Sequence, residues 1–412
     1  MPSNFSFMNQ IRRRTKEFLL ILASVGVTLS LLDAFLHVTR FIYILPIRVP
    51  YPQYYYEKDD NIGFDISKNF KKQKVSYFDF SYDVWSNELG CFDDPYRGET
   101  PYIYLAGDSF TWGFTPFQDK WGTKLQSFLG LRTVKCGVPG FGTKHSLLKS
   151  TELLEHLPTP ELIIVGYYVN DVSEDEHFPY RTLYNGYVVT DFSHENLSIS
   201  QVEEYYQNLS KYGMVRKPPL PFVQGLKWWL TKNSIIYNLL KTKIKEILPA
   251  HMLDILERKG FILSEESTLT SSGTPEQLVP VNETHIEAIR SFKTLAQNKG
   301  AKLLFVIIPY LEEVYSKSEE ISSYSDKIKP LLEEESIAYL DLLPFFRSYA
   351  NTASLYWTHD DHWNIQGNHL AGMIVAEYLI NEKLIEIPEA ENILKVIHTR
   401  KEAEFGTSSM RF

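Results

Sequence analysis

Ser109 is the residue of this chain that is best placed to act as a nucleophile. It follows the apolar run Tyr102–Ala106, and Gly107 ends that run. Aromatic and branched side chains in such a run are typical of a strand buried on both faces. In an open α/β sheet, ligands bind outside the carboxyl ends of the strands, so a serine at this point is well placed for chemistry. A serine hydroxyl is a poor nucleophile unless a base takes its proton and another group orients that base.

The candidates for that base lie in the cluster of two histidines and two aspartates at residues 359–362. In an extended or turn segment, residues i and i+2 project the same way. We therefore expect Asp360 to reach the ring of His362 and to hold the tautomer whose other nitrogen faces Ser109. Asp361 is expected to point elsewhere, and His359 is a rival base that lacks an i−2 carboxylate. A metal site is the alternative interpretation of this cluster, but no third ligand is marked, so we predict no metal.

An acyl transfer also needs hydrogen-bond donors for the charge that develops on the carbonyl oxygen. The candidates are the amides of Ser109 and Gly140 and the side chain of Asn170, because each lies just past the end of a predicted strand. Taken singly, each has an ordinary explanation as turn chemistry. Their shared position at strand ends is what favours a common crevice.

Four short blocks in this order resemble the SGNH (GDSL-type) hydrolase superfamily. The blocks are Gly107-Asp108-Ser109, Gly137-x-x-Gly140, Asn170-Asp171 and Asp360-x-His362. The resemblance implies an α/β fold in which a doubly wound parallel sheet is flanked by helices. It also implies that Ser109 is the nucleophile, His362 the base and Asp360 the residue that orients it. In that family the serine amide, the glycine amide and the asparagine side chain form the oxyanion hole, here Ser109, Gly140 and Asn170.

The chain departs from this family pattern at three positions. Tyr168 stands where a glycine often precedes the block asparagine, and Lys135 stands where many members have asparagine. His359 occupies the position three residues before the histidine, where the aspartate is often found. The two-residue spacing from Asp360 to His362 resembles the subset that includes membrane-anchored or periplasmic glycan O-acyltransferases.

These features predict a serine esterase that forms an acyl-enzyme on an ester-bearing small molecule, a lipid or an acylated glycan. An O-acyltransferase that moves an acyl group to or from a cell-surface glycan would use the same residues. A non-catalytic anchored binding protein on the same fold is the third alternative. The net charge of −9 argues against a nucleic-acid partner, because phosphate binding favours a basic face. No cofactor is expected.

The N-terminal segment predicts a membrane anchor. Residues 18–38 are almost continuously apolar, which is long enough to cross a bilayer, and four basic residues precede them between positions 12 and 16. A positive flank stays in the cytoplasm, so we expect a single-pass protein whose catalytic domain is periplasmic or extracellular. A cleaved signal peptide and a buried helix are the alternatives, and Asp33 gives weight to the latter because a carboxylate within the span is costly.

Four regions follow from composition and periodicity. They are a basic stub with the anchor (1–40), a linker with edge strands (41–100), the α/β catalytic domain (101–385) with a mostly helical insert at about 172–283, and a polar peripheral tail (386–412). Within the insert, Asn185-Gly186 predicts a hairpin turn. Helical spacing from 226 to 244 indicates a packed helix, a lid or a helix on a membrane surface. Two cysteines, Cys91 and Cys136, are too few for a disulfide framework. They either pair with each other in an exported chain or remain unpaired as small buried groups.

Overall fold

The computed structural model describes residues 3–39, 51–77, 80–176, 178–179, 181–184, 186–190, 234–237, 281–315, 324–357 and 361–406. The chain divides into two compact units. One consists of residues 1–48 and 207–270, and the other of residues 49–206 and 271–412.

In its described part, the first unit contains the long helix α1 (Ser3–Thr39). Its stretch of 24 residues from Arg13 to Leu36 has a mean hydropathy of 2.2 and is almost entirely exposed, so it is long and apolar enough to cross a membrane. A signal sequence near an N-terminus meets the same description. Within this unit, Asp33 accepts hydrogen bonds from the Ser234 hydroxyl (3.2 Å) and the Ile236 amide (2.9 Å). The carboxylate that interrupts the apolar run is therefore hydrogen-bonded.

The second unit contains a five-stranded, fully parallel sheet. Its strands are β5 (Tyr102–Gly107), β6 (Arg132–Lys135), β7 (Leu162–Tyr167), β10 (Lys302–Ile307) and β11 (Ala338–Asp341), in the order β11-β10-β7-β5-β6. Every residue of β5 and β7 is buried, which explains why the sequence reads there as continuous apolar runs. The order reverses between β5 and β7, so the sheet is doubly wound, and the predicted fold class is confirmed.

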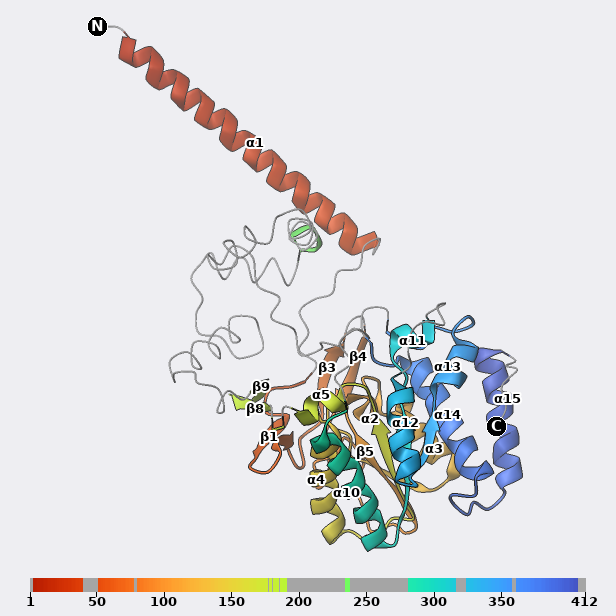
Figure 1. The fold of residues 1–412 in the computed structure, drawn as a ribbon. Coiled ribbons are helices and arrows are strands. Elements are labelled where there is room, and N and C mark those ends of the chain that lie inside the picture. The colour runs from red at the N-terminus through yellow and green to blue at the C-terminus, as the bar shows by residue number, and fades with distance from the viewer. Residues whose placement is uncertain are drawn as a thin grey trace. The chain divides into compact units, whose positions relative to one another are not determined.

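Helices cover the sheet on both faces (Figure 1). The described helices of this unit are α2 (Ser109–Trp112), η1 (Phe117–Asp119), α3 (Trp121–Leu129), α4 (Thr143–His156), α5 (Asp171–Glu176), α10 (Glu283–Lys299), α11 (Leu311–Tyr315), α12 (Ser325–Glu334), α13 (Leu343–Tyr349), α14 (Ile365–Asn381) and α15 (Ala390–Phe405). Helix α4 packs against α10, while α3, α14 and α15 pack together on the other side. Gly300 ends α10 in a left-handed conformation, as the sequence predicts.

Two antiparallel ribbons precede the sheet where the sequence favoured a linker with edge strands. They are β1 (Tyr56–Asp59) with β2 (Gly63–Ile66), and β3 (Gln73–Tyr77) with β4 (Phe80–Val84), and neither joins the main sheet. Together with residues that follow Ser109, they bury a second core of mostly aromatic side chains. Tyr55 in this core accepts a hydrogen bond from the Trp112 indole at 2.9 Å. The ribbons therefore support the segment that carries the serine.

The chain after residue 385 also differs from the expected polar tail. Helix α15 packs on α14 and α3 and buries Ile397, Lys401 and Phe405. The buried Lys401 ammonium is paired with the Glu377 carboxylate on α14. The apolar stripe of α15 is narrow and lies among charged residues, so composition alone did not reveal it.

The described part of the insert begins with α5 and a hairpin. Strands β8 (Arg181–Tyr184) and β9 (Tyr187–Thr190) pair in antiparallel register, with Tyr184 opposite Tyr187 and Gly186 at φ +80°. The predicted hairpin is confirmed. The helix predicted from 226 to 244 lies outside the described residues except for 234–237.

Candidate active site

Ser109 and His362 meet at the carboxyl edge of the sheet. Ser109 opens α2, two residues beyond the end of β5, and its Oγ lies 2.7 Å from Nε2 of His362. Both residues are buried, with 7% and 8% of their surface exposed. Gly107 between strand and helix has φ +141°, and a Cβ there would collide with the Thr111 hydroxyl and the Gly166 carbonyl. Only glycine permits this sharp turn, which brings the serine directly over the strand end.

The loop that carries His362 is fixed at both ends. Tyr356 and Trp363 form an isolated antiparallel bridge, and the Trp357 amide donates to the His362 carbonyl at 3.0 Å. Asn364 then caps α14, because its side chain accepts from the Gly367 amide at 3.0 Å. The histidine is thus held between a bridge and a helix start.

Two phenylalanine rings flank the imidazole. The ring centroid of Phe114 lies 4.4 Å from that of His362, and the centroid of Phe110 lies 4.9 Å away. Phe110 directly follows the serine, whereas Phe114 belongs to the second core. Their packing limits rotation of the imidazole, so Nε2 stays directed at Ser109.

Asp361 approaches the other nitrogen of the imidazole. Its Oδ1 lies 3.5 Å from Nδ1 of His362, and its Oδ2 accepts a hydrogen bond from the Tyr168 hydroxyl at 3.3 Å. The expectation that Asp361 points elsewhere is therefore wrong. Residues 361 and 362 lie in a bend, where the alternation of an extended chain does not apply. Asp360 and His359 lie outside the described residues.

Asp108, the residue before the serine, also places its carboxylate near the Ser109 hydroxyl. Asp108 caps α2 by accepting from the Phe110 amide at 2.9 Å, and its Oδ2 lies 3.4 Å from the Ser109 hydroxyl. His362 at 2.7 Å is the closer acceptor for the single hydroxyl proton. Burial raises the pKa of Asp108 to about 6, although the Phe110 amide and His362 oppose this shift. Burial and the nearby Asp108 also raise the pKa of Asp171 well above its usual range.

Gly140 lies in a tight turn beyond β6. The Val138 amide donates to the Gly107 carbonyl (3.0 Å), and the Phe141 amide donates back to Val138 (3.1 Å). Gly140 has φ +84°, and a Cβ on it would collide with the guanidinium of Arg181, the first residue of β8. Sequence and structure agree here on a position that only glycine occupies without strain.

Asn170 lies three residues beyond the end of β7 and directly precedes α5. Its carbonyl accepts from the Ser173 hydroxyl (2.9 Å) and the Glu174 amide (3.0 Å), so its backbone is fixed. Its side-chain oxygen Oδ1 is buried and has no hydrogen-bond partner among the described residues. Gly107 and Gly166 are paired in the sheet, so Ser109 and Asn170 follow neighbouring strands at the point where the strand order reverses. Ligands of doubly wound sheets bind at this point.

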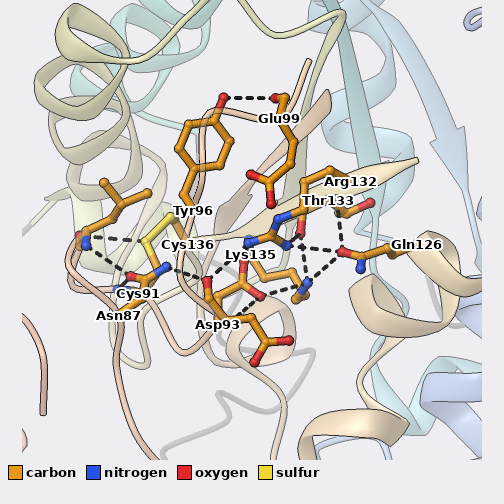
Figure 2. A network of polar contacts seen from close by, with 12 residues as sticks. Asn87, Cys91, Asp93, Tyr96, Glu99, Gln126, Arg132, Thr133, Lys135 and Cys136 are labelled. Atoms are coloured by element: carbon orange, nitrogen blue, oxygen red, sulfur yellow. Dashed lines mark hydrogen bonds and ion pairs between the residues drawn. A yellow bond between two sulfur atoms is a disulfide. The ribbon is translucent and has the colours of Figure 1, made fainter. Parts of the chain in front are cut away.

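A buried ionic network is centred on Asp93 and includes Lys135, which comes shortly before the Gly140 turn in the chain (Figure 2). The Asp93 carboxylate accepts from Arg132 (2.9 Å) and from the Lys135 ammonium (2.8 Å) and amide (3.0 Å). Burial lowers the pKa of Lys135, and Asp93 counteracts that shift. Beside the network, Cys91 and Cys136 form a disulfide, which settles the alternatives left open by the sequence. Because Cys136 directly precedes residues 137–140, covalent and ionic links together anchor this turn.

The contributions of Phe114 and of the ribbons could not be predicted from the sequence. Both depend on contacts between distant segments and carry no local signal. Tyr168 stood out in the sequence because it departs from the pattern of the family that the chain resembles. Its contact with Asp361 could not be predicted from that departure. In the described part of the chain, no three His, Cys, Asp or Glu side chains come together as a metal site.

No family model matches this chain, and no curated protein matches its sequence. Similar solved structures include the acetyl xylan esterase AlAXEase, with 13% identity and a TM-score of 0.34 over 68% of this chain and 98% of that chain. TesA has 14% identity and a TM-score of 0.35 over 69% and 99%. A member of the lipolytic protein G-D-S-L family from Veillonella parvula DSM 2008 has 10% identity and a TM-score of 0.34 over 66% and 93%. Likenesses with TM-scores this low carry no argument about the site or its chemistry.

Proposed function

We propose that this protein is a serine hydrolase of the SGNH (GDSL) type that cleaves ester bonds through an acyl-enzyme. The observation that carries the proposal is the 2.7 Å contact between the Ser109 hydroxyl and Nε2 of His362 at the reversal point of the sheet. A nucleophile and a base at hydrogen-bond distance, with the base itself flanked by a carboxylate, are what this chemistry requires.

In the proposed reaction, Nε2 of His362 takes the proton as Ser109 attacks the ester carbonyl. The amides of Ser109 and Gly140 and the side chain of Asn170 donate to the resulting oxyanion. His362 then gives the proton to the leaving alcohol, and water hydrolyses the acyl-enzyme by the same route in reverse. Asp361 stabilises the imidazolium that forms in each half.

Covalent labelling tests this proposal. A fluorophosphonate probe should label the wild-type protein at Ser109, and Ser109→Ala and His362→Ala should lose labelling and hydrolysis of p-nitrophenyl acetate. Ser150→Ala is the matched control, because Ser150 is fully buried on α4 and its hydroxyl donates to the Ser146 carbonyl. Labelling of Ser109→Ala at the wild-type level would contradict both enzymatic interpretations and leave the non-catalytic binding protein.

The orienting carboxylate is tested separately. Oδ1 of Asp361 lies 3.5 Å from Nδ1 of His362. The residue spacing of the SGNH family instead assigns the orienting role to Asp360. We expect Asp361→Asn to lower kcat by about a hundredfold or more, as loss of an orienting carboxylate does in serine hydrolases, and Asp360→Asn to lower it less. A larger loss in Asp360→Asn would return the role to that residue.

An O-acyltransferase acting on a cell-surface glycan is the second candidate. The apolar helix α1 and the Cys91–Cys136 disulfide favour it, because disulfides persist in oxidising compartments outside the cytoplasm. In this proposal α1 anchors the catalytic unit to the outer side of the membrane. Fractionation should then place the full chain in the membrane pellet, with Cys91 and Cys136 resistant to alkylation until they are reduced.

Product analysis separates the two reactions. The purified chain is incubated with p-nitrophenyl acetate and a soluble oligosaccharide. Acetylated oligosaccharide that is absent with Ser109→Ala supports transfer, whereas release of acetate alone supports hydrolysis.

A further inference from the structure

Tyr168 connects the end of β7 to the loop that carries the base. It is 2% exposed, and its hydroxyl donates to Oδ2 of Asp361 at 3.3 Å. The other oxygen of the same carboxylate, Oδ1, lies 3.5 Å from Nδ1 of His362. Asp361 therefore stands between a phenol and the imidazole, with one oxygen directed to each.

The phenol is suited to orient a carboxylate. Burial and the neighbouring Asp361 raise the pKa of Tyr168 well above its usual value. The hydroxyl thus keeps its proton and can donate it to Oδ2 of Asp361. At 3.3 Å this hydrogen bond is longer than the usual O–H···O distance, so it sets the direction of the carboxylate rather than holding it tightly.

The ring of Tyr168 supports the same structure from a second direction. Its centroid lies 4.4 Å from that of Phe110, whose own centroid lies 4.9 Å from the His362 ring. Tyr168 therefore contacts both the stack that supports the imidazole and the carboxylate that faces Nδ1. A glycine, which the family pattern often has here, provides neither contact.

We propose that Tyr168 is a positioning residue for the acyl-transfer reaction: its hydroxyl fixes Asp361 opposite His362 and so keeps Nε2 directed at Ser109. This inference rests on the proposed function. Tyr168 does not act on the substrate itself, and its effect passes through Asp361.

Tyr168→Phe removes the hydroxyl and keeps the ring. Hydrolysis of p-nitrophenyl acetate by the full chain should show kcat lowered about tenfold, as expected for loss of one hydrogen bond, with KM unchanged. Tyr102→Phe is the matched control. Tyr102 is also buried, and its hydroxyl donates to the Pro158 carbonyl at 2.6 Å, at the start of β5 and so at the opposite end of that strand from Ser109. It should lose thermal stability but keep kcat.

A double-mutant cycle gives the readout that a merely structural role would not change. If Tyr168 acts through Asp361, Tyr168→Phe should cost about tenfold in the wild-type protein but less than about twofold in Asp361→Asn, since coupled residues are not additive. Equal costs in both backgrounds, or a wild-type kcat in Tyr168→Phe, would overturn the inference. Ser109→Ala is measured alongside: if it retains turnover the proposed function itself fails, and if it is inactive while the cycle is additive only the role of Tyr168 fails.

Discussion

Replacing Asp108 by asparagine should make the protein more stable at pH 8 but not at pH 4. Asparagine keeps the cap of α2, because its side-chain oxygen still accepts from the Phe110 amide. What changes is the charge. Asp108 is 1% exposed, and burial raises its pKa from 3.8 to about 6.

The sign and size follow from linkage. A carboxyl whose pKa is higher in the folded state binds its proton more tightly there, so its contribution to stability is complete below pH 4 and is lost as the pH rises through 6. The shift from 3.8 to about 6 corresponds to about 3 kcal/mol above pH 7. The asparagine side chain of the variant does not titrate. The carboxyl of the unfolded chain is already partly ionised at pH 4, so the unfolding free energy of Asp108→Asn minus that of the wild type should rise by about 2.4 kcal/mol between pH 4 and pH 8.

Guanidinium titrations of the full chain in mild detergent, at pH 4, 6 and 8, measure this difference. Any constant effect of the amide cancels, because only the change with pH is used. Asp326→Asn is the control: Asp326 is 65% exposed on α12, and its difference should stay within about 0.5 kcal/mol at each pH. A flat difference for Asp108→Asn, or one that falls with pH, would refute the assignment of Asp108 as a carboxyl destabilised by burial.

Three further outcomes are expected. Asn170→Ala should lower kcat by about 10²–10³, the loss of one oxyanion donor, and near-normal turnover would show that Asn170 is not such a donor. Gly140→Ala should lower both the melting temperature and kcat, because a Cβ there meets the Arg181 guanidinium at φ +84°. Gly130→Ala is its control, since Gly130 has φ +64° with nothing within 4 Å, and it should cost only about 1 kcal/mol of stability and no activity. Asp93→Asn should lower the unfolding free energy by about 3–5 kcal/mol because it leaves Lys135 buried without its carboxylate, and Asp93→Asn with Lys135→Met should recover most of that loss.

The sheet could be predicted from the sequence because its information is local. Leu162–Tyr167 is apolar at every position since β7 is buried on both faces, and the same holds for β5. Ser109 and His362 were also found from local blocks. The structure brings these two together across the fold, at hydrogen-bond distance.

The position of Asp361 could not be predicted in the same way. The chain was expected to alternate there, but residues 361 and 362 lie in a bend, and Oδ1 of Asp361 lies 3.5 Å from Nδ1 of His362. Asp360 lies outside the described residues, so its orienting role stays a prediction. The bend lies next to the Tyr356–Trp363 bridge, a contact that no local pattern encodes.

The second, aromatic core also could not be predicted, because it depends on contacts between residues far apart in the sequence. Tyr55 and Trp112 are 57 residues apart, and aromatic side chains pair without any fixed spacing in sequence. A stretch rich in tyrosine and proline therefore resembled a linker until its partners were known. Helix α15 shows the complementary case, in which a narrow apolar stripe is hidden among lysines and glutamates.

The separation of Ser109 and His362 along the chain, 253 residues, has a consequence for biosynthesis. At a ribosomal rate of about 5–20 residues per second, the serine is made roughly 10–50 s before its histidine. Strands β10 and β11 are also made after Ser109 and before His362. A nascent chain that has not yet reached residue 362 therefore carries the Ser109 hydroxyl without the imidazole that lies 2.7 Å from it in the folded protein.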